Sequence, residues 1–369
     1  MREWSDRNKY NSFSSDKGLT YYENYKAIVN WMDGGEHLPP PIEVNLDPYA
    51  TCNLSCYFCI VQRYLKHHRE ELGMLQLPTT YMYKLIDFLH EWGVRGLCIS
   101  GGGEPTLHEG VWGLPRYANS KGMKASIFTN ATTLDNPKAE DLLWCQWIAL
   151  SVDAGTRGTY RKVKGKDWFG KVTHNIEILA NIRYEKHYNA NLCYKFLIVP
   201  DNMGEIHKAC KLAKELGVQD FHARPVDFER KDIKNAQRLH FNMEMIAEEF
   251  DKCHEEETED FHVYTVTHKF SPEFHVKHDF TKCLATPLML PILTDGNAYI
   301  CPDKKMEQKF KLGSAYPEPE SILDWWGSDK HRELIKNVNV DSCSRCTWGI
   351  YNRQISEVVM KDNMCLDFP

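Results

Sequence analysis

The chain has 369 residues, of which 42% are hydrophobic and 26% are charged, and its formal net charge is −6. This is the composition of a globular protein with room for one large domain and a smaller one, and it lacks the basic excess that binds nucleic-acid phosphates. No run of 18 apolar residues is present and residues 1–14 are polar, so we expect neither a membrane span nor a secretory signal. The expected location is the cytoplasm, where thiols stay reduced, and the 13 cysteines therefore need an explanation other than disulfides.

From residue 42 onward, short apolar runs alternate with longer amphipathic ones. Strands are expected at 42–48, 96–101, 124–130, 147–153, 190–199 and 220–226. Helices are expected near 80–93, 111–122, 136–145, 168–187 and 203–216. Strands that alternate with helices predict a parallel sheet with right-handed crossovers. Six such units predict an α/β fold, a partial (β/α)6 barrel of the TIM type that lacks two units of the closed form.

The pattern changes after residue 227. Residues 228–282 are charged and rich in histidine, with one expected helix at 241–256. Asp295-Gly296 lies between two β-rich runs and predicts a hairpin, because glycine readily adopts the positive φ of a tight turn. The predicted organisation is an N-terminal extension (1–41), the barrel (42–227), a connecting region (228–282) and a small C-terminal α+β domain of hairpin plus helix (283–369).

Three cysteines follow the first expected strand. Cys52, Cys56 and Cys59 have the spacing C-x3-C-x2-C. Three thiolates this close can hold one iron–sulfur cluster, and in a four-iron cluster they leave one iron open to a further ligand. The alternatives are packing as small hydrophobic residues, or zinc binding, although a structural zinc site usually has four ligands.

With the aromatic Phe58 before its last cysteine, this motif resembles the signature of the radical S-adenosylmethionine (SAM) superfamily. The resemblance implies a [4Fe–4S] cluster on the three cysteines, with SAM chelating its open iron. It further implies reductive cleavage of SAM to a 5′-deoxyadenosyl radical, which abstracts a hydrogen atom from the substrate. Phe58 would lie near the adenine, and a reductant such as flavodoxin or ferredoxin is the implied protein partner.

Further candidates end the expected strands, where barrel enzymes concentrate their catalytic groups. The run 101–105, Gly-Gly-Gly-Glu-Pro, resembles the GGE motif of the family, which implies that Gly102, Gly103 and Glu104 hold the SAM amino group. By the same resemblance, residues that end the third and fourth strands lie near the SAM ribose and carboxylate. These residues are Thr129, Asn130, Ser151 and Asp153.

Two basic residues lie within apolar strands, where charged side chains are rarely without a role. Lys195 and Arg224 could bind the SAM carboxylate or an anionic group of the substrate, and a structural ion pair is the alternative. Asn202, just past the fifth strand, is a similar candidate at a strand end.

A second set of cysteines lies in the C-terminal region. Cys283, Cys301, Cys343 and Cys346 supply four thiolates, which suit either an iron–sulfur cluster or a structural zinc ion. The spacing resembles the start of the SPASM extension of radical SAM enzymes, but the second group of cysteines of that extension is missing. The spacing therefore resembles the shorter twitch domain. This resemblance implies one auxiliary [4Fe–4S] cluster on these four residues, with Cys365 as a spare.

The remaining cysteines show no clustering and are expected to pack as small hydrophobic residues. They are Cys98, Cys145, Cys193, Cys210 and Cys253. The histidines of residues 228–282 match no metal motif and are expected to be solvated or packed.

The resemblance predicts an oxidation, in which the auxiliary cluster accepts an electron from the substrate radical. A small molecule such as a sugar or an aminocyclitol is the expected substrate, rather than a peptide, because only about 41 residues precede the first strand. Other radical outcomes remain open: epimerisation, dehydration, cyclisation or peptide modification. A non-catalytic iron–sulfur or zinc protein is a further alternative, against which the GGE motif argues.

Overall fold

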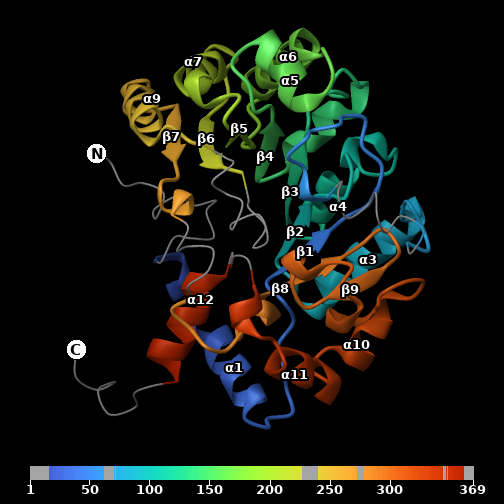
Figure 1. Cartoon of the computed structure of the whole chain (residues 1–369). Coiled ribbons are helices and arrows are strands. Elements are labelled where there is room, and N and C mark those ends of the chain that lie inside the picture. Colours follow the sequence, from blue (N-terminus) through green and yellow to red (C-terminus); the bar gives the residue numbers. More distant parts are fainter. Residues whose placement is uncertain are drawn as a thin grey trace.

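The structure is a computed structural model that describes residues 16–61, 70, 72–226, 240–271, 278–343, 346 and 348–360. A ten-stranded sheet runs through it in the order β10-β9-β8-β1-β2-β3-β4-β5-β6-β7 (Figure 1). The strands are β1 (Glu43–Leu46), β2 (Gly96–Ile99), β3 (Lys124–Thr129), β4 (Trp147–Ser151), β5 (Asn191–Ile198), β6 (Asp220–Pro225), β7 (His262–Thr265), β8 (Met289–Ile292), β9 (Asn297–Tyr299) and β10 (Lys311–Ser314).

The first six strands are parallel neighbours in chain order and coincide with the six strands predicted from the sequence. The predicted partial barrel is confirmed. Two further parallel strands extend it, since β7 pairs with β6 and β8 pairs with β1. Strand β7 falls in the segment expected to be irregular, which therefore contains more regular structure than its charged sequence indicates.

Helices cover the convex side of the curved sheet (Figure 1). They are α3 (Thr79–Trp92), α4 (Leu114–Ser120), α5 (Arg157–Lys164), α6 (Phe169–Glu185), α7 (Ile206–Glu215) and α9 (Met243–Glu255). In α3 the buried residues recur at helical spacing and include Met82, Leu85 and Leu89. Burying each such side chain contributes on the order of 2 kcal/mol, so this stripe fixes the helix against the sheet.

Strand register decides which side chains face the concave interior. Successive strand residues point to opposite faces, and register partners on neighbouring strands share a face. Ser151, Lys195, His222 and Tyr264 are successive register partners on β4, β5, β6 and β7. A polar and basic row therefore crosses one face of the sheet, from the end of β4 through the middle of β5 and β6 to β7.

The C-terminal region adds the predicted hairpin and short helices. Strands β8 and β9 are antiparallel around Gly296, whose φ is +75°. The helices are α10 (Ile322–Trp325), α11 (Asp329–Lys336) and α12 (Gly349–Gln354). Near the N-terminus, α1 (Tyr22–Met32) packs on this region: the Trp31 indole donates to the Gly327 carbonyl at 2.8 Å, and Arg332 donates to the Trp31 carbonyl at 3.0 Å.

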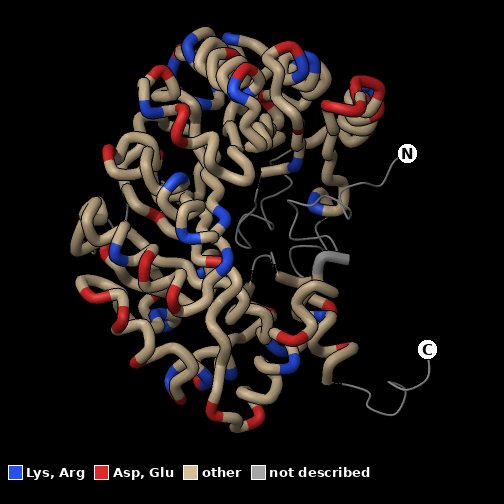
Figure 2. Tube along the Cα trace, turned by 180° about the vertical axis from the view of Figure 1, so that it is seen from behind, with Lys and Arg blue, Asp and Glu red and all other residues tan. Residues whose placement is uncertain are grey.

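Basic and acidic positions are interspersed along the described chain, without separation into one basic and one acidic half (Figure 2). Within the described ranges, no helix combines the length and apolar character needed to cross a membrane.

Candidate active site beside the first cysteine set

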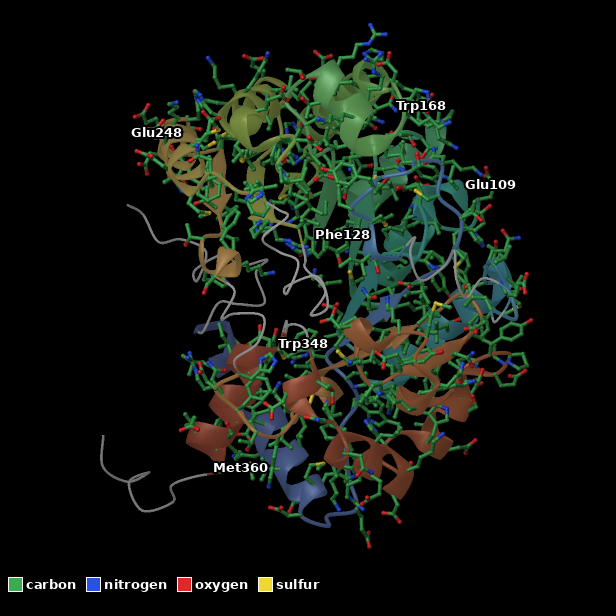
Figure 3. All side chains as sticks on the ribbon, viewed as in Figure 1. Glu109, Phe128, Trp168, Glu248, Trp348 and Met360 are labelled. Carbon is green, nitrogen blue, oxygen red and sulfur yellow. The ribbon has the colours of Figure 1, made fainter. Side chains whose placement is uncertain are left out.

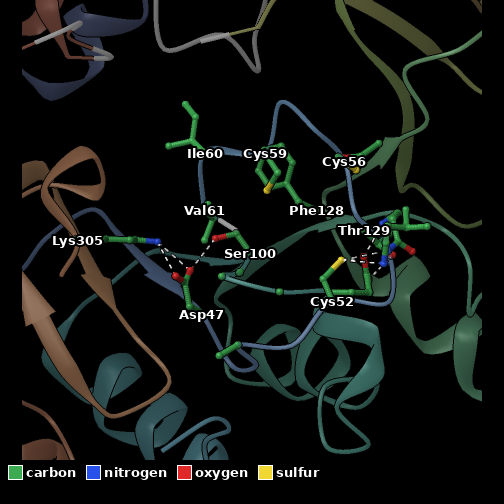
Figure 4. Close-up of a pocket in the computed structure, with 18 of the residues that line it drawn as sticks. Asp47, Cys52, Cys56, Cys59, Ile60, Val61, Ser100, Phe128, Thr129 and Lys305 are labelled. Atoms are coloured by element: carbon green, nitrogen blue, oxygen red, sulfur yellow. Dashed lines mark hydrogen bonds and ion pairs between the residues drawn. The ribbon is translucent and has the colours of Figure 1, made fainter. Parts of the chain in front are cut away.

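The loop after β1 carries the first three cysteines along the wall of a cavity of about 410 Å³ (Figure 4). Backbone hydrogen bonds fix the loop: Ser55 N donates to the Lys164 carbonyl at 3.1 Å, and Cys59 N donates to the Cys56 carbonyl at 3.1 Å. Cys52, Cys56 and Cys59 are each partly accessible and all line this cavity. The structure thus brings the three predicted ligands to one hollow.

The Cys52 sulfur accepts hydrogen bonds from two donors. Leu54 N donates to Cys52 Sγ at 3.5 Å, and the Asn130 amide donates to the same sulfur at 3.9 Å. Burial raises the pKa of Cys52 to about 11, and burial also raises that of Cys56 although Lys164 opposes it. Without a metal these thiols stay protonated, and iron binding must release their protons. Donors aimed at sulfur suit thiolate ligands, which carry negative charge.

The glycine-rich turn after β2 packs directly on the cysteine loop. Gly103 N donates to the Tyr49 carbonyl at 2.9 Å, and Glu104 N donates to the Thr51 carbonyl at 3.0 Å. A Cβ on Gly103 would lie 2.1 Å from the Thr51 carbonyl oxygen, so only glycine allows this approach. Gly102 and Gly103 both line the cavity, as the GGE resemblance leads one to expect of residues that contact a ligand.

The Glu104 carboxylate is buried and ties two strand ends together. Its Oε1 accepts hydrogen bonds from the hydroxyls of Thr106 and Thr129, each at 2.6 Å, and its Oε2 accepts one from Asn130 N at 2.6 Å. Burial raises the pKa of this carboxyl, and the hydroxyl donors oppose the shift. Glu104 therefore fixes the ends of β2 and β3 at the cavity wall.

A buried ion pair lies beside the cysteine loop. Lys164, the last residue of α5, contacts the Asp153 carboxylate that follows β4, and both side chains are almost fully buried. Burial lowers the pKa of Lys164, but the Asp153 carboxylate outweighs this and the net pKa is raised. The Lys164 ammonium lies 5.7 Å from the centre of the Phe58 ring. Ser151, Asp153, Phe58 and Lys164 all line the cavity.

A second ion pair joins the barrel to the C-terminal region. Lys305 Nζ donates to the two carboxylate oxygens of Asp47 at 2.8 and 2.9 Å and to Asn45 at 2.9 Å (Figure 4). Asp47 follows β1, and Lys305 follows the turn after Cys301. Asp47, Asp303 and Lys305 line the same cavity as the first three cysteines. Phe128, another lining residue, is labelled near the middle of the view in Figure 3.

The second set of cysteines is assembled from three segments. Cys283 precedes β8, Cys301 follows β9, and Cys343 and Cys346 precede α12. Burial raises the pKa of Cys346 to about 12, and the charges of other cysteines of this set add to the rise in the pKa values of Cys283, Cys301 and Cys346.

Asn352, on α12, supports this second set from inside the protein and is fully buried. Its Oδ1 accepts hydrogen bonds from Leu284 N at 2.6 Å and Ala285 N at 2.8 Å, and its amide nitrogen donates to Cys346 Sγ at 3.7 Å. One side chain therefore links the segment after Cys283 to the segment that carries Cys346.

In the described parts of the chain, no three His, Cys, Asp or Glu side chains converge as ligands of a single metal ion. A cubane cluster spreads its ligands over separate iron atoms and does not need such convergence.

Comparisons with known proteins agree with this geometry. A family model described as "Radical SAM superfamily" matches residues 46–213, and one described as "Iron-sulfur cluster-binding domain" (SPASM) matches residues 283–347. The chain therefore contains a radical SAM domain and a SPASM iron–sulfur cluster domain. The radical SAM segment includes the first three cysteines, and the SPASM segment includes the other four.

Two curated relatives are an "AdoMet-dependent heme synthase" of Methanosarcina barkeri and the "Mycofactocin maturase MftC" of Mycobacterium ulcerans. The heme synthase is 28% identical over 47% of this chain and 47% of its own length. The maturase is 25% identical over 52% of this chain and 49% of its own length. This chain thus aligns with about half the length of each. Among solved structures, Streptococcus suis SuiB bound to precursor peptide SuiA is similar in fold, with a TM-score of 0.60 and 15% identity over 91% of this chain and 74% of SuiB.

The predicted cofactors follow from these two domains and are confirmed at that level. A radical SAM enzyme uses SAM and a [4Fe–4S] cluster, and a SPASM domain binds auxiliary iron–sulfur clusters. The residues present fit both groups. Three thiols beside the cavity would leave one iron of a cluster open to a further ligand, and four thiols would supply every ligand of a second cluster. The roles of individual residues remain predictions.

The other candidates of this radical SAM chain lie in different settings. Thr129 and Asn130 line the cavity, whereas Lys195 on β5 and Arg224 on β6 are not among its lining residues. Asn202 is held by the backbone, donating to the Asp153 and Leu197 carbonyls at 2.9 Å each, as expected of a strand-end cap.

The unclustered cysteines are buried, as predicted, and Cys365 and His275 lie outside the described residues. The sequence did not identify four further residues at the two cysteine sets. Their contacts join segments that are far apart in the chain, or the end of a helix to the end of a strand. They are Lys164, Lys305, Asp303 and Asn352. The Lys164-Gly165 pair at the end of a basic helix was the available local signal for the first of these.

Proposed function

We propose that this chain cleaves SAM reductively and uses the resulting radical to oxidise an organic substrate, with the auxiliary cluster as electron acceptor. The observation that carries this proposal is the cavity that reaches from the first cysteine set to the residues next to Cys301. Its wall includes Cys52, Cys56 and Cys59 and also Pro302 and Asp303, which follow Cys301. A substrate in this cavity would lie between the site of hydrogen abstraction and the site that accepts the electron.

Residues of the barrel would bind and orient the cosubstrate. We assign Cys52, Cys56 and Cys59 as ligands of the SAM cluster, and Gly102, Gly103 and Glu104 as the surface that receives the SAM amino group. Asn130, Ser151 and Asp153 would hold the ribose and carboxylate from the strand ends. When bound, the reduced cluster supplies the electron that converts SAM to methionine and a 5′-deoxyadenosyl radical.

The electron balance requires a second acceptor. The substrate C–H bond breaks homolytically and its hydrogen atom passes to the 5′ carbon, giving 5′-deoxyadenosine. The substrate radical must then lose one proton and one electron to become an oxidised product. Four thiolates, which we assign to Cys283, Cys301, Cys343 and Cys346, would hold the cluster that receives that electron.

A small molecule is the substrate we propose first, since the cavity of about 410 Å³ lies within the range of small-ligand sites. The same oxidation on a peptide is a second candidate. It is favoured by the similarity to a mycofactocin maturase and by the fold shared with SuiB, whose structure contains a precursor peptide.

Iron and sulfide content tests the two-cluster assignment. The anaerobically reconstituted wild type should hold about eight irons, as two cubane clusters require, and a variant with Cys52, Cys56 and Cys59 replaced by alanine should hold about four. With dithionite and SAM, only the wild type should form 5′-deoxyadenosine. Wild type with about four irons plus zinc would remove the electron acceptor and overturn the oxidation.

A further inference from the structure

Part of the cavity wall carries polar residues that the cofactor assignments do not use. Asp47 follows β1, Ser100 follows β2 and Lys305 lies on the segment after Cys301, and all three line the cavity. In Figure 4 they lie to the left of Cys52, which is assigned to the SAM cluster. With SAM held against the cysteine loop, as proposed above, the wall around Asp47 is left for the substrate.

The donors among these three side chains are already used by the protein. Lys305 Nζ donates to Asp47 Oδ1, Asp47 Oδ2 and Asn45 Oδ1 at 2.8, 2.9 and 2.9 Å, so its three protons have three acceptors. The Ser100 hydroxyl lies 3.1 Å from both Asn45 Oδ1 and Asp47 Oδ1, and its single proton goes to one of them. A ligand at this wall therefore meets few free protons.

The acceptors of the same wall have capacity left. Among the described residues, Asp47 Oδ2 accepts one hydrogen bond, from Lys305, whereas a carboxylate oxygen can accept two. Ser100 Oγ acts as a donor and keeps its lone pairs. Asp47 is only 3% exposed, so its remaining partner must be water or a ligand inside the cavity. The wall favours a ligand that donates a hydrogen bond.

Apolar side chains surround this polar spot. Four lining residues belong to one small hydrophobic cluster that joins the barrel to the C-terminal region: Ala50, Val61, Leu72 and Met306. Met306 has a φ of +68°, a conformation that L side chains rarely adopt and that concentrates at ligand sites. Phe128 also lines the cavity and is 39% exposed, so an apolar ligand would cover it.

We propose that Asp47 binds a hydroxyl or amino group of the substrate while the apolar side chains around it enclose the rest of the molecule. The inference rests on the proposed function and narrows its substrate class to an apolar alcohol or amine. The bound group would lie beside Lys305, on the segment that follows Cys301, and so at the end of the cavity nearest the proposed electron acceptor.

The same wall disfavours two other classes of substrate. A sugar would place several hydroxyls against apolar side chains, where they lose hydrogen bonds to water without replacement. A carboxylate or a phosphate would meet the Asp47 charge at a wall whose Lys305 and Ser100 donors are already committed.

The test is a ligand-observed NMR titration of the reconstituted, SAM-bound full chain with benzyl alcohol, benzoate and inositol. Wild type should bind benzyl alcohol saturably and about tenfold or more tightly than either other probe, because only benzyl alcohol combines an apolar body with one neutral donor. Asp47→Asn replaces an acceptor oxygen with a donor and should weaken benzyl alcohol about tenfold or more. Asp135→Asn, an exposed aspartate paired with Lys171, is the matched control and should bind as wild type does.

A second variant tests the apolar half without disturbing the ion pair. Phe128→Ala should also weaken benzyl alcohol, with Tyr184→Ala, 78% exposed in the native chain, as its control. Iron content and SAM affinity should match wild type in every variant, which excludes misfolding.

Four results would each overturn the proposal. They are absence of saturable benzyl alcohol binding to wild type, tighter binding of benzoate or inositol, unchanged binding in Asp47→Asn or Phe128→Ala, and a selective loss of SAM affinity in Asp47→Asn. Failure of the proposed function would look different. It would appear as absence of 5′-deoxyadenosine from reduced wild type supplied with SAM, a measurement that involves none of these probes.

Discussion

The two cysteine sets of this protein are built in opposite ways. Cys52, Cys56 and Cys59 lie on one loop after β1, so their short spacing in the chain keeps the three donors near one another. Cys283, Cys301 and Cys346 come from separate segments and meet only when the hairpin and α12 are in place. The first set is local in sequence and lines the cavity, whereas the second set, which we predict to supply four ligands, is assembled by tertiary structure.

This difference follows the chemistry expected of each site. An iron with no protein ligand is needed where a cosubstrate must bind, and three donors beside a lined cavity provide it. An electron acceptor needs no open position and gains from a complete ligand shell. Replacing residues at each cysteine set in turn tests this contrast between an open and a closed site.

The largest effect is expected at the open site. Replacing Cys56 with alanine should remove the SAM cluster and reduce 5′-deoxyadenosine formation at least a thousandfold, because no other route reduces SAM. Electron paramagnetic resonance of the reduced protein should retain only the auxiliary signal. Cys145→Ala, which removes a buried cysteine outside both sets, is the control and should keep both signals. Persistent SAM cleavage in Cys56→Ala would contradict the ligand assignment.

Replacement at the closed site should separate the two reactions. Cys346→Ala should remove the auxiliary cluster yet leave SAM cleavage within a few-fold of wild type, because the radical SAM loop is held by its own contacts. Substrate oxidation should be lost while 5′-deoxyadenosine still forms. If SAM cleavage and the first cluster disappear together with the second, the two sites depend on one another for folding and the contrast drawn here is wrong.

The sequence predicted the local site better than the assembled one, and the reason is physical. The six strands and the first three cysteines are visible because periodicity and short spacing are properties of neighbouring residues. Strand β7 has only four residues, and exposed His262 and half-buried Tyr264 interrupt its apolar character, so it carried too weak a signal.

Contacts that exist only in the fold could not be predicted. Asn352 is remote in sequence from Leu284, and Lys305 is remote from Asp47, so no local pattern announces either pair. The second cysteine set was anticipated only through its resemblance to the SPASM extension, since spacing alone suited zinc equally well.

A third prediction concerns the support of the cosubstrate. Glu104→Gln keeps the side-chain shape but replaces one acceptor oxygen with a donor and removes the negative charge that would attract the SAM ammonium. SAM affinity should fall about 10- to 100-fold, since a hydrogen bond to a charged group contributes about 1.5–3 kcal/mol. Equilibrium binding to reconstituted protein measures this, with Glu109→Gln as an exposed control. Unchanged affinity would leave Glu104 a purely structural link between β2 and β3.

The smallest effect tests how the two sites treat sulfur. Asn130 donates to Cys52 Sγ at 3.9 Å, and Asn352 donates to Cys346 Sγ at 3.7 Å. Hydrogen bonds to cluster sulfur favour the reduced, more negative state. Asn352→Asp keeps the acceptor for Leu284 N but replaces the donor with an oxygen, so the auxiliary potential should fall by about 60 mV or more, the equivalent of a tenfold change in a one-electron equilibrium.

A redox titration followed by electron paramagnetic resonance separates this effect from damage to the fold. The potential of the SAM cluster should stay constant in Asn352→Asp, because that cluster is bound by a different loop. Asn352→Ala would also remove the acceptor for Leu284 N and Ala285 N, and should lower the unfolding temperature, whereas the aspartate variant should lower it less. If both potentials change together, or neither changes, Asn352 has no specific influence on the auxiliary cluster. The two sites would then differ only in the number of their cysteine ligands.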